Sequence, residues 1–288
     1  MSSSAFGGAT VREALDSAVI AIGAAGSDTP RLDAELLLAE ALAVDRTALF
    51  TDPGREVAGS AVRLFQNAVR RRSVGREPVA YILGRKGFRF IDLDVDARVL
   101  VPRPETELLV ELGLTLARGA RVVDVGTGSG AIALALKHER PDLDVCATDS
   151  SAEALAVARA NATRLGLDVR LIEGDLLAGA GAGAGAGSCD AVLCNPPYVA
   201  EGERTSLAPE ITRHEPDGAL FAGEDGLDVI RRLVPAAAGS LAAGGLLAIE
   251  VGEGQAGAVA RMLESAGFRD VRALRDLAGI ERVVTGLR

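Results

Sequence analysis

Hydrophobic residues recur with helical spacing over the first quarter of the chain. One apolar stripe consists of Val11, Leu15, Ala18 and Ile22, and another of Val62, Phe65 and Val69. Asp28 and Thr29 before Pro30 are typical of a helix start, with proline in the first turn. The pattern predicts a small all-helical domain over residues 1–84, of which residues 1–9 are expected to be a disordered start.

Between Phe88 and Val101 the hydrophobic residues no longer recur with helical spacing but at every second position. Alternating apolar positions in this segment predict a β-hairpin or an extended linker. Pro102-Arg103-Pro104 ends it, and Glu105-Thr106-Glu107 opens a helix that runs through Leu116. We therefore expect residues 85–104 to form a hairpin linker and residues 105–288 to form a second domain.

Short apolar runs alternate with helical segments over the rest of the chain, which is typical of a parallel α/β sheet. The expected strands are Arg121–Val125, Asp144–Thr148, Val169–Ile172, Ala191–Cys194, Leu246–Val251, and two more near Val271 and Val283-Val284. The last two are close in sequence and are expected to form an antiparallel hairpin. The Ala/Gly run from Ala178 to Gly187 predicts a flexible surface loop.

Composition narrows the class of protein. The 288 residues are 48% hydrophobic but only 3% aromatic, so the core has to be built from aliphatic side chains. The net charge of −9 argues against non-specific nucleic-acid binding, which requires a basic surface. The basic run Arg70-Arg71-Arg72 is interpreted as a solvated helix end, although a local basic patch is the alternative.

The three cysteines do not have the spacing of a zinc site, and no histidine pair lies near them. Cys146 and Cys194 fall in expected strands and are interpreted as small core residues. The chain has no long uncharged apolar stretch and no basic segment leading into an apolar one. We expect a cytoplasmic protein that holds no metal and does not enter a membrane.

A glycine-rich turn connects the strand ending at Val125 to the helix that follows. Its glycines, Gly126, Gly128 and Gly130, allow a ligand to approach the backbone at a helix N-terminus. Asp149 ends the next strand, where an acid can hold ribose hydroxyls. The turn fits both the relaxed dinucleotide pattern and the turn of methyltransferases that bind S-adenosylmethionine. Asp175 and Leu176 are candidates for contacts to adenine, with a turn or cap role for Asp175 as the alternative.

Asn195-Pro196-Pro197-Tyr198 closes a buried strand with two consecutive prolines, each of which fixes φ and lacks an N–H. A side-chain amide, rigid carbonyl acceptors and an aromatic ring therefore lie together at a strand end. Such a group can accept both hydrogens of a planar –NH2 and cover its face. The segment predicts a site that acts on an amide or on an exocyclic amine.

Taken together, these motifs resemble class I S-adenosylmethionine-dependent methyltransferases, and more closely the HemK-type family of release factor glutamine N5-methyltransferases. The resemblance covers nearly the whole chain. It is carried by Glu77–Gly84, Val101–Glu107, Gly126–Gly130, Asp149, Asn195–Tyr198, Glu215-Pro216 and Ala219-Leu220, in this order. It implies a Rossmann-like sheet of seven mostly parallel strands, and methyl transfer to the glutamine of the Gly-Gly-Gln motif in release factors.

The resemblance also implies roles for individual residues. The cofactor set would be Gly126, Thr127, Gly128, Ser129, Gly130, Asp149, Asp175, Leu176 and Asn195. Leu176 stands where family members often carry an aromatic residue. Asn195 Oδ1 and the Pro196 carbonyl would accept the two hydrogens of the substrate amide, with Pro197 and Tyr198 completing the substrate site. Asn195 and Pro196 are thus the expected catalytic residues.

The roles of several charged residues stay open at this stage. Arg103 either approaches the cofactor or braces the linker. Glu210 and Glu215 either belong to a segment that covers the site or are solvated charges. His138 and His214 are interpreted as structural or exposed, because methyl transfer to an amide requires no strong base beforehand.

Four other functions compete with this interpretation. Adenine N6-methylation of DNA or RNA would use the same grip on a planar –NH2, but the acidic chain contains only two lysines, Lys86 and Lys137. Glutamine methylation of another protein, such as a ribosomal protein, would keep the reaction and change the partner. A dehydrogenase would leave Asn195–Tyr198 unexplained, and a non-catalytic binding module would require the glycine-rich turn to have no function in catalysis.

Overall fold

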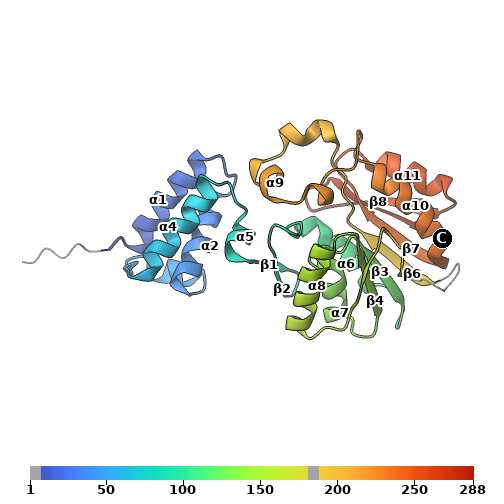
Figure 1. The fold of residues 1–288 in the computed structure, drawn as a ribbon, viewed down its shortest axis with the longest axis horizontal. Helices are drawn as coiled ribbons and strands as arrows, with labels where there is room; N and C mark the ends of the chain where they lie inside the picture. The colour runs from blue at the N-terminus through green and yellow to red at the C-terminus, as the bar shows by residue number, and fades with distance from the viewer. Residues whose placement is uncertain (1–7, 181–187) are drawn as a thin grey trace, which may run out of the picture. The chain divides into compact units, whose positions relative to one another are not determined.

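The computed structural model describes residues 8–180 and 188–288, which form two compact units (Figure 1). The first unit contains the chain up to Gly84 together with Pro209–His214. The second contains Arg85–Ala208 and Glu215–Arg288. The expectations for the first seven residues and for most of the Ala/Gly run fall on residues 1–7 and 181–187, outside the described part.

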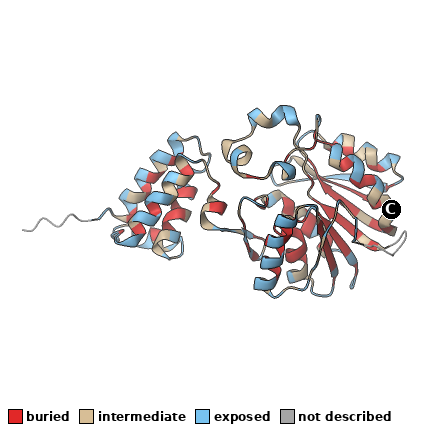
Figure 2. Ribbon diagram, viewed as in Figure 1, coloured by how far each residue is buried: buried red, intermediate tan, exposed pale blue. Residues whose placement is uncertain are grey.

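The first unit is all-helical, as the apolar stripes predict. Its helices are α1 Val11–Ala24, α2 Pro30–Leu42, α3 Ala48–Thr51, α4 Ser60–Ser73, α5 Val79–Leu83 and α9 Pro209–His214. All four residues of the first predicted stripe are buried in its core, and buried positions alternate with exposed ones along these helices (Figure 2). Thr10 caps α1 through a reciprocal pair of hydrogen bonds with Glu13.

Arg72 is buried, so the interpretation of Arg70-Arg71-Arg72 as a solvated helix end is wrong for this residue. Its Nε donates to Asp33 Oδ2 at 2.7 Å, and Nη2 donates to Glu210 Oε1 at 3.1 Å. Glu210 also pairs with Arg76. The buried guanidinium therefore joins α2, α4 and α9 within the first unit.

A hairpin opens the second unit, but it lies earlier than the period-two pattern indicates. Strands β1 Arg85–Phe88 and β2 Ile91–Asp94 pair antiparallel around a turn at Arg89, whose φ is 49°. The following residues 95–103 form no strand, although Val95, Val99 and Val101 are buried. The alternation of apolar residues in this segment therefore reflects the burial of an irregular stretch of chain and not a strand. Asn161 on α8 (Ala152–Leu165) exchanges two hydrogen bonds with the backbone of Asp94 and holds the hairpin on this unit.

The sheet of the second unit has seven strands in the order β5-β4-β3-β6-β7-β9-β8. They are β3 Arg121–Val125, β4 Asp144–Asp149, β5 Arg170–Glu173, β6 Cys189–Cys194, β7 Leu241–Glu250, β8 Arg269–Arg275 and β9 Glu281–Leu287. The first five positions of this order pair in parallel, while β9 pairs antiparallel with both β7 and β8. The expected mostly parallel sheet and its late antiparallel hairpin are confirmed.

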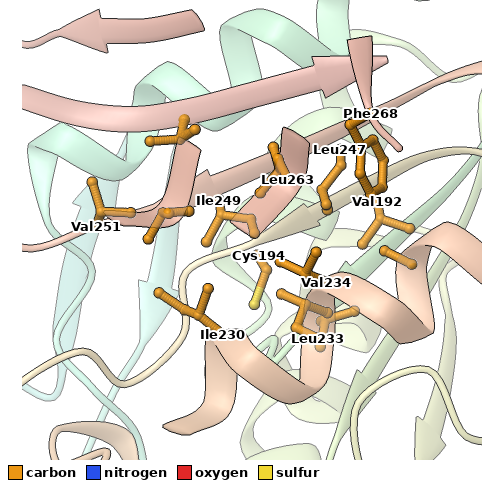
Figure 3. Close-up of a cluster of buried hydrophobic side chains, with 14 of the residues drawn as sticks. Val192, Cys194, Ile230, Leu233, Val234, Leu247, Ile249, Val251, Leu263 and Phe268 are labelled. Carbon is orange, nitrogen blue, oxygen red and sulfur yellow. The ribbon is translucent and has the colours of Figure 1, made fainter. Parts of the chain in front are cut away.

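Helices cover both faces of this sheet (Figure 1). The main ones are α6 Glu107–Leu114, α7 Ala131–Glu139, α8, α10 Asp228–Ser240 and α11 Ala256–Ser265, joined by the short 3-10 turns η1 Pro104–Thr106, η2 Glu201–Ser206 and η3 Asp217–Ala219. Because side chains alternate along a strand, Val192 and Cys194 of β6 pack with α10 and α11 in one aliphatic core (Figure 3). Leu193 faces the other way, toward Gly113 of α6.

No helix among the described residues is long and apolar enough to span a bilayer.

The buried ion-pair network of the first unit yields a stability prediction. Replacing Arg72 with Met should lower the free energy of unfolding by about 3–5 kcal/mol, because buried Asp33 and half-buried Glu210 would lose this partner. Urea unfolding of the full chain measures the effect. Arg70→Met on the exposed face of the same helix is the control and should cost less than about 0.5 kcal/mol. Equal effects of the two substitutions would contradict a structural role for Arg72.

Candidate active site

The register of the parallel strands aligns the start of four loops at one edge of the sheet. Val125 pairs with Thr148 on one side and with Cys194 on the other, and Cys194 pairs with Ile249. The next residues along these four strands are Gly126, Asp149, Asn195 and Glu250. They form one row at the carboxyl edge. The strand order reverses between β3 and β6, which is where open α/β sheets bind ligands.

The glycine turn after β3 keeps its backbone open to the cavity. Gly126, Gly128 and Gly130 have φ values of 72°, 55° and 88°, a region that favours glycine. A Cβ atom added to Gly128 would meet no protein atom within 4 Å, and one added to Gly126 would lie 3.8 Å from the Asn195 carbonyl. Side chains there would thus occupy ligand space. Gly130 has a different role, since its Cβ would come within 2.7 Å of Leu134 in α7.

Asp149 is held by two backbone N–H groups. Its Oδ2 accepts from Gly128 at 2.9 Å, and its Oδ1 accepts from Ser151 at 2.9 Å. The carboxylate is half-buried at the cavity wall. Each oxygen retains a lone pair for a further donor, such as a ribose hydroxyl.

A second acid, Asp124, lies behind the glycine turn and was missed by the sequence reasoning. It is fully buried, and its Oδ2 accepts from the Thr127 hydroxyl at 2.7 Å and from the Ala133 N–H at 3.2 Å. Burial raises the pKa of Asp124 to about 7. The residue ties the turn to the start of α7, and its place inside strand β3 concealed it in the sequence.

A cavity of about 450 Å³ lies over this row, within the volume range of small-molecule sites. Of the predicted site residues, it is lined by Gly126, Gly128, Asp149, Asp175, Leu176, Asn195, Pro196 and Pro197. Further lining comes from Arg98–Leu100, Ser150, Ser151, Gly218, Val229 and Arg232, which the sequence reasoning did not predict, and from Pro216 and Ala219, which it named only as family motifs. Arg98–Leu100 and Val229 offered no motif, because their position depends on tertiary packing.

Three members of the predicted cofactor set do not line the cavity. Thr127 is buried against Asp124, and the Ser129 carbonyl accepts a hydrogen bond from Asn161 at 3.0 Å. Gly130 caps α7. These residues support the turn from behind while Gly126 and Gly128 present it.

Asp175 and Leu176 lie at the rim of the same cavity. The Asp175 carboxylate forms an ion pair with Arg232 of α10, and both side chains are exposed. Leu176 has a positive φ of 54°, and its carbonyl accepts from the Thr148 hydroxyl at 2.6 Å. The ion pair is an arrangement that neither sequence interpretation of Asp175 included.

The amide of Asn195 is oriented by Thr106, a residue that the sequence analysis named only as part of a helix start. Its Nδ2 donates to the hydroxyl of Thr106 in η1 at 3.0 Å. Oδ1 is therefore left to accept hydrogen bonds at the cavity wall, together with the backbone of Pro196. The site thus presents rigid acceptors next to the glycine turn.

Tyr198 is not among the residues that line the cavity. Its hydroxyl donates to Glu250 Oε1 at 3.3 Å, and its carbonyl accepts from Gln255 Nε2 at 2.9 Å. Burial raises the pKa of the Tyr198 phenol. The aromatic end of the tetrapeptide is thereby attached to β7 and to the turn before α11.

The remaining charged residues have structural partners. Arg103 Nη2 donates to Glu215 Oε1 at 2.6 Å, so it braces the segment before η1, which was one of its two expected roles. Glu215 and Glu210 are not solvated charges, because Glu215 is buried and Glu210 pairs with Arg72 and Arg76. The two histidines lie away from the cavity: His138 is exposed, and His214 Nε2 lies 2.8 Å from the Gly75 carbonyl.

The cysteines behave as core residues. Cys146, Cys189 and Cys194 are free thiols and all are buried. Among residues 8–180 and 188–288, no group of three or more His, Cys, Asp or Glu side chains could hold a metal ion.

Comparison with known families and proteins agrees with this geometry. Residues 13–84 match the family described as the PrmC N-terminal domain, and residues 103–218 match the methyltransferase small domain. A release factor glutamine methyltransferase from Deinococcus radiodurans is 43% identical, covering 96% of this chain and 98% of its own length. An enzyme of the same name from Pseudomonas aeruginosa is 45% identical over 90% of this chain and 93% of its own length.

Solved structures support the fold of the second unit. A methyltransferase from Pyrococcus furiosus superimposes with a TM-score of 0.51 at 19% identity, covering 70% of this chain and 91% of its own. At this identity the likeness concerns the fold alone. It agrees with the seven-stranded class I methyltransferase sheet expected from the sequence.

The raised pKa of Asp124 predicts how stability depends on pH. The native carboxyl keeps a proton up to about pH 7, whereas the unfolded chain releases it near its ordinary value of 3.8. The stabilisation is therefore complete below about pH 4 and is lost as the pH rises through 7. In Asp124→Asn the amide oxygen can replace Oδ2, and the variant has no carboxyl group to titrate at this position. Between pH 5 and 8 its free energy of unfolding should therefore rise relative to that of the wild type by at least about 1 kcal/mol.

Urea unfolding at several pH values measures this difference, and the exposed Asp168→Asn is the matched control. Other titrating groups, Glu250 included, are common to both proteins and cancel. A difference that stays constant with pH would show that Asp124 is ionised throughout.

Proposed function

Because the chain belongs to the release factor glutamine methyltransferase family, we propose that it transfers a methyl group from S-adenosylmethionine to the side-chain amide nitrogen of the glutamine in the Gly-Gly-Gln motif of a peptide-chain release factor. The observation that carries the proposal is the orientation of Asn195. Its Nδ2 donates to Thr106, which leaves Oδ1 as the amide atom that can accept, and both Asn195 and Pro196 line the cavity beside the glycine turn.

The cavity fits S-adenosylmethionine as the methyl donor. Gly126 and Gly128 have no side chains to fill the space beside α7, and Asp149 retains acceptor sites for ribose hydroxyls. Leu176 and Asp175 lie at the rim where the adenine would be held. When bound, S-adenosylmethionine supplies an electrophilic methyl group on a positively charged sulfur and leaves as S-adenosylhomocysteine. We propose no metal in this site.

An amide nitrogen is a poor nucleophile, because its lone pair is delocalised into the carbonyl group. The residues of the tetrapeptide can compensate for this. Hydrogen bonds from its two N–H groups to Asn195 Oδ1 and to the Pro196 carbonyl would polarise the nitrogen and direct its lone pair toward the methyl group. Positioning of this kind supplies about 7–11 kcal/mol in the best cases. Pro197 fixes the backbone, and Tyr198, which does not line the cavity, supports the tetrapeptide through its bonds to Glu250 and Gln255.

The transfer needs no strong base beforehand. The bond between sulfur and the methyl carbon breaks as the bond between nitrogen and that carbon forms, and the sulfur keeps the electron pair. The methylated nitrogen then releases one proton to water or to a carbonyl acceptor. The positions of His138 and His214 away from the cavity are compatible with this sequence.

We further propose a division of work between the parts of the chain. Residues 1–84 would recognise the release factor, residues 85–104 would connect, and residues 105–288 would carry the methyl transfer. The substrate places the reaction in the cytoplasm. The net charge of −9 on this chain favours a protein substrate over stable binding to nucleic acid.

Cofactor binding gives the first test. The wild type should bind S-adenosylmethionine and not NAD in calorimetry, which separates a methyltransferase from a dehydrogenase. Asp149→Asn should weaken binding about 10- to 100-fold, because a charged acceptor for the ribose hydroxyls is lost. Asp168→Asn, an exposed substitution of the same kind, should bind as the wild type. Wild-type affinity in Asp149→Asn would refute the ribose role.

Mass spectrometry of a release factor tests the reaction itself. Incubation with methyl-labelled S-adenosylmethionine should add one methyl group to the glutamine of the Gly-Gly-Gln motif. Asn195→Ala should lower kcat at least about 100-fold with a modest loss of cofactor affinity, because the substrate amide loses an acceptor. Asn67→Ala on the exposed face of α4 is the control. Label on DNA, RNA or a ribosomal protein instead would keep the cofactor and overturn the substrate.

A further inference from the structure

We propose that Gln255 is a positioning residue, which sets the direction of the Pro196 carbonyl by holding the peptide unit that follows Tyr198. The use of this carbonyl in catalysis rests on the proposed function. The hydrogen bonds of Gln255 are a property of the chain without substrate, so they can be tested separately.

The two prolines of the tetrapeptide do not by themselves decide where the Pro196 carbonyl points. Each proline ring fixes φ, but the rotation ψ about the bond to the carbonyl carbon remains soft. Neither proline has an N–H group that a neighbouring loop can hold. The direction of the Pro196 carbonyl therefore depends on how the chain is anchored before and after the two prolines.

The sheet anchors the chain before the prolines. Cys194 pairs with Val125 on one side and with Ile249 on the other. The side chain of the next residue, Asn195, donates to the Thr106 hydroxyl at 3.0 Å. Between this anchor and Tyr198 the ψ rotations of both prolines are still undetermined.

The anchor after the prolines is the peptide unit that joins Tyr198 to Val199, which is held at both of its polar atoms. Its carbonyl accepts from Gln255 Nε2 at 2.9 Å, and its N–H donates to the Leu220 carbonyl at 2.9 Å. Because a peptide unit is planar, bonds to its two opposite sides fix its orientation. With both ends held, the rotations of the two prolines between them are restricted, and so is the direction of the Pro196 carbonyl.

The orientation of the Gln255 side chain is itself determined by the loop after β7. Its Oε1 accepts from the Gly252 N–H at 2.9 Å, and a backbone N–H can only donate. The NH2 group is therefore directed away from Gly252, toward the carbonyl of Tyr198, and lies 3.4 Å from that of Asp225. The Gln255 N–H donates to the Gly252 carbonyl at 3.1 Å and closes the turn. Gln255 thus offers Tyr198 a donor and not an acceptor.

Gly226 provides the space in which this contact forms. It is buried with a φ of 75°, and a Cβ atom added to it would collide with the Tyr198 carbonyl oxygen. The same Cβ atom would lie 2.8 Å from Gln255 Nε2. A side chain at position 226 would therefore push the two partners of the hydrogen bond apart, which gives a second way to disturb the anchor.

The sequence permits a measurement on this one peptide unit. Tyr81 is followed by Ile82 and Tyr198 by Val199, so the chain contains a single Tyr-Val pair. Tyrosine labelled with ¹³C at the carbonyl and valine labelled with ¹⁵N together give one NMR signal, from the peptide unit after Tyr198. A hydrogen bond deshields a carbonyl carbon, so Gln255→Met should move this signal to a lower ¹³C shift in the substrate-free protein.

The same variant should separate the reaction from cofactor binding. Gln255→Met should lower kcat on the release factor about 10- to 100-fold, because the Pro196 carbonyl is no longer held where the substrate amide meets it. Gln255 is not among the residues that line the cavity, so the affinity for S-adenosylmethionine in calorimetry should stay within about threefold of the wild type. Gln66→Met, an exposed substitution of the same kind, should leave the NMR signal and kcat unchanged.

Gln255→Glu is a second variant at the same position. It keeps the length of the side chain and an acceptor for the Gly252 N–H, but an ionised carboxylate has no hydrogen to donate to the Tyr198 carbonyl. It should therefore reproduce both the change of the carbonyl signal and the loss of kcat.

Gly226→Ala tests the anchor from the opposite side. The added methyl group should displace the Tyr198 carbonyl from Gln255, move the NMR signal and lower kcat as Gln255→Met does. Gly244 is the matched control, because its φ is 76° and a Cβ atom added there would meet no protein atom within 4 Å. Gly244→Ala imposes the same backbone strain without the collision, so the signal and kcat should stay at their wild-type values.

The outcomes distinguish this proposal from the proposed function. A carbonyl signal that is unchanged in both Gln255 variants would overturn the positioning role, whatever the enzyme methylates. A shifted signal with wild-type kcat would also overturn it, and so would a loss of S-adenosylmethionine affinity as large as the loss of kcat. If the wild type methylates a different substrate, the proposed substrate fails, while the carbonyl signal still reports the anchor and kcat is measured on that other substrate.

Discussion

The alignment of parallel strand ends is the constraint on which the site depends. In a parallel sheet each strand delivers the start of its loop to the same edge, and the pairing of Thr148, Val125, Cys194 and Ile249 sets the four loops level. The glycine turn, the ribose acid, the tetrapeptide and Glu250 are consecutive in space because these strands are neighbours, although they are spread over 125 residues of chain from Gly126 to Glu250. Slipping one strand by one residue would turn its loop and its side chains to the wrong face.

Burial sets the pKa values and the hydrogen bonds of the polar groups at this edge of the sheet. The core beneath it is apolar and mostly aliphatic, with Val192, Ile249 and their neighbours packed against α10 and α11 (Figure 3). In such surroundings a carboxyl group costs free energy unless it is protonated or hydrogen-bonded. Asp124 and Glu250 both have raised pKa values for this reason, and they accept hydrogen bonds from the hydroxyls of Thr127 and Tyr198 respectively. The same low polarity that stabilises the fold therefore strengthens the few hydrogen bonds that shape the site.

Local patterns predicted the elements best where one physical cause dominates. The stripe from Val11 to Ile22 and the strand Arg121–Val125 are as expected, because helical period and a short apolar run report burial directly. The hairpin lies earlier in the chain than predicted, because the apolar residues from Val95 to Val101 are buried without pairing as strands. Arg72 was assigned to solvent, and solvent was one of two alternatives for Glu215, because charged residues usually are exposed. The structure buries both among partners that lie 39 and 112 positions away in the chain.

The sequence by itself determined the two-part organisation, the mostly parallel sheet, the glycine turn with its acid and the tetrapeptide at the end of β6. These follow from period, turn chemistry and short motifs, all of which act over a few residues. Only the tertiary structure decided that Thr106 orients Asn195, that the Tyr198 hydroxyl bonds to Glu250, and that Arg98–Leu100 and Arg232 reach the cavity. Those contacts join residues far apart in the chain, and a hydrogen bond has a range of about 3 Å, so no local pattern can encode which of them form.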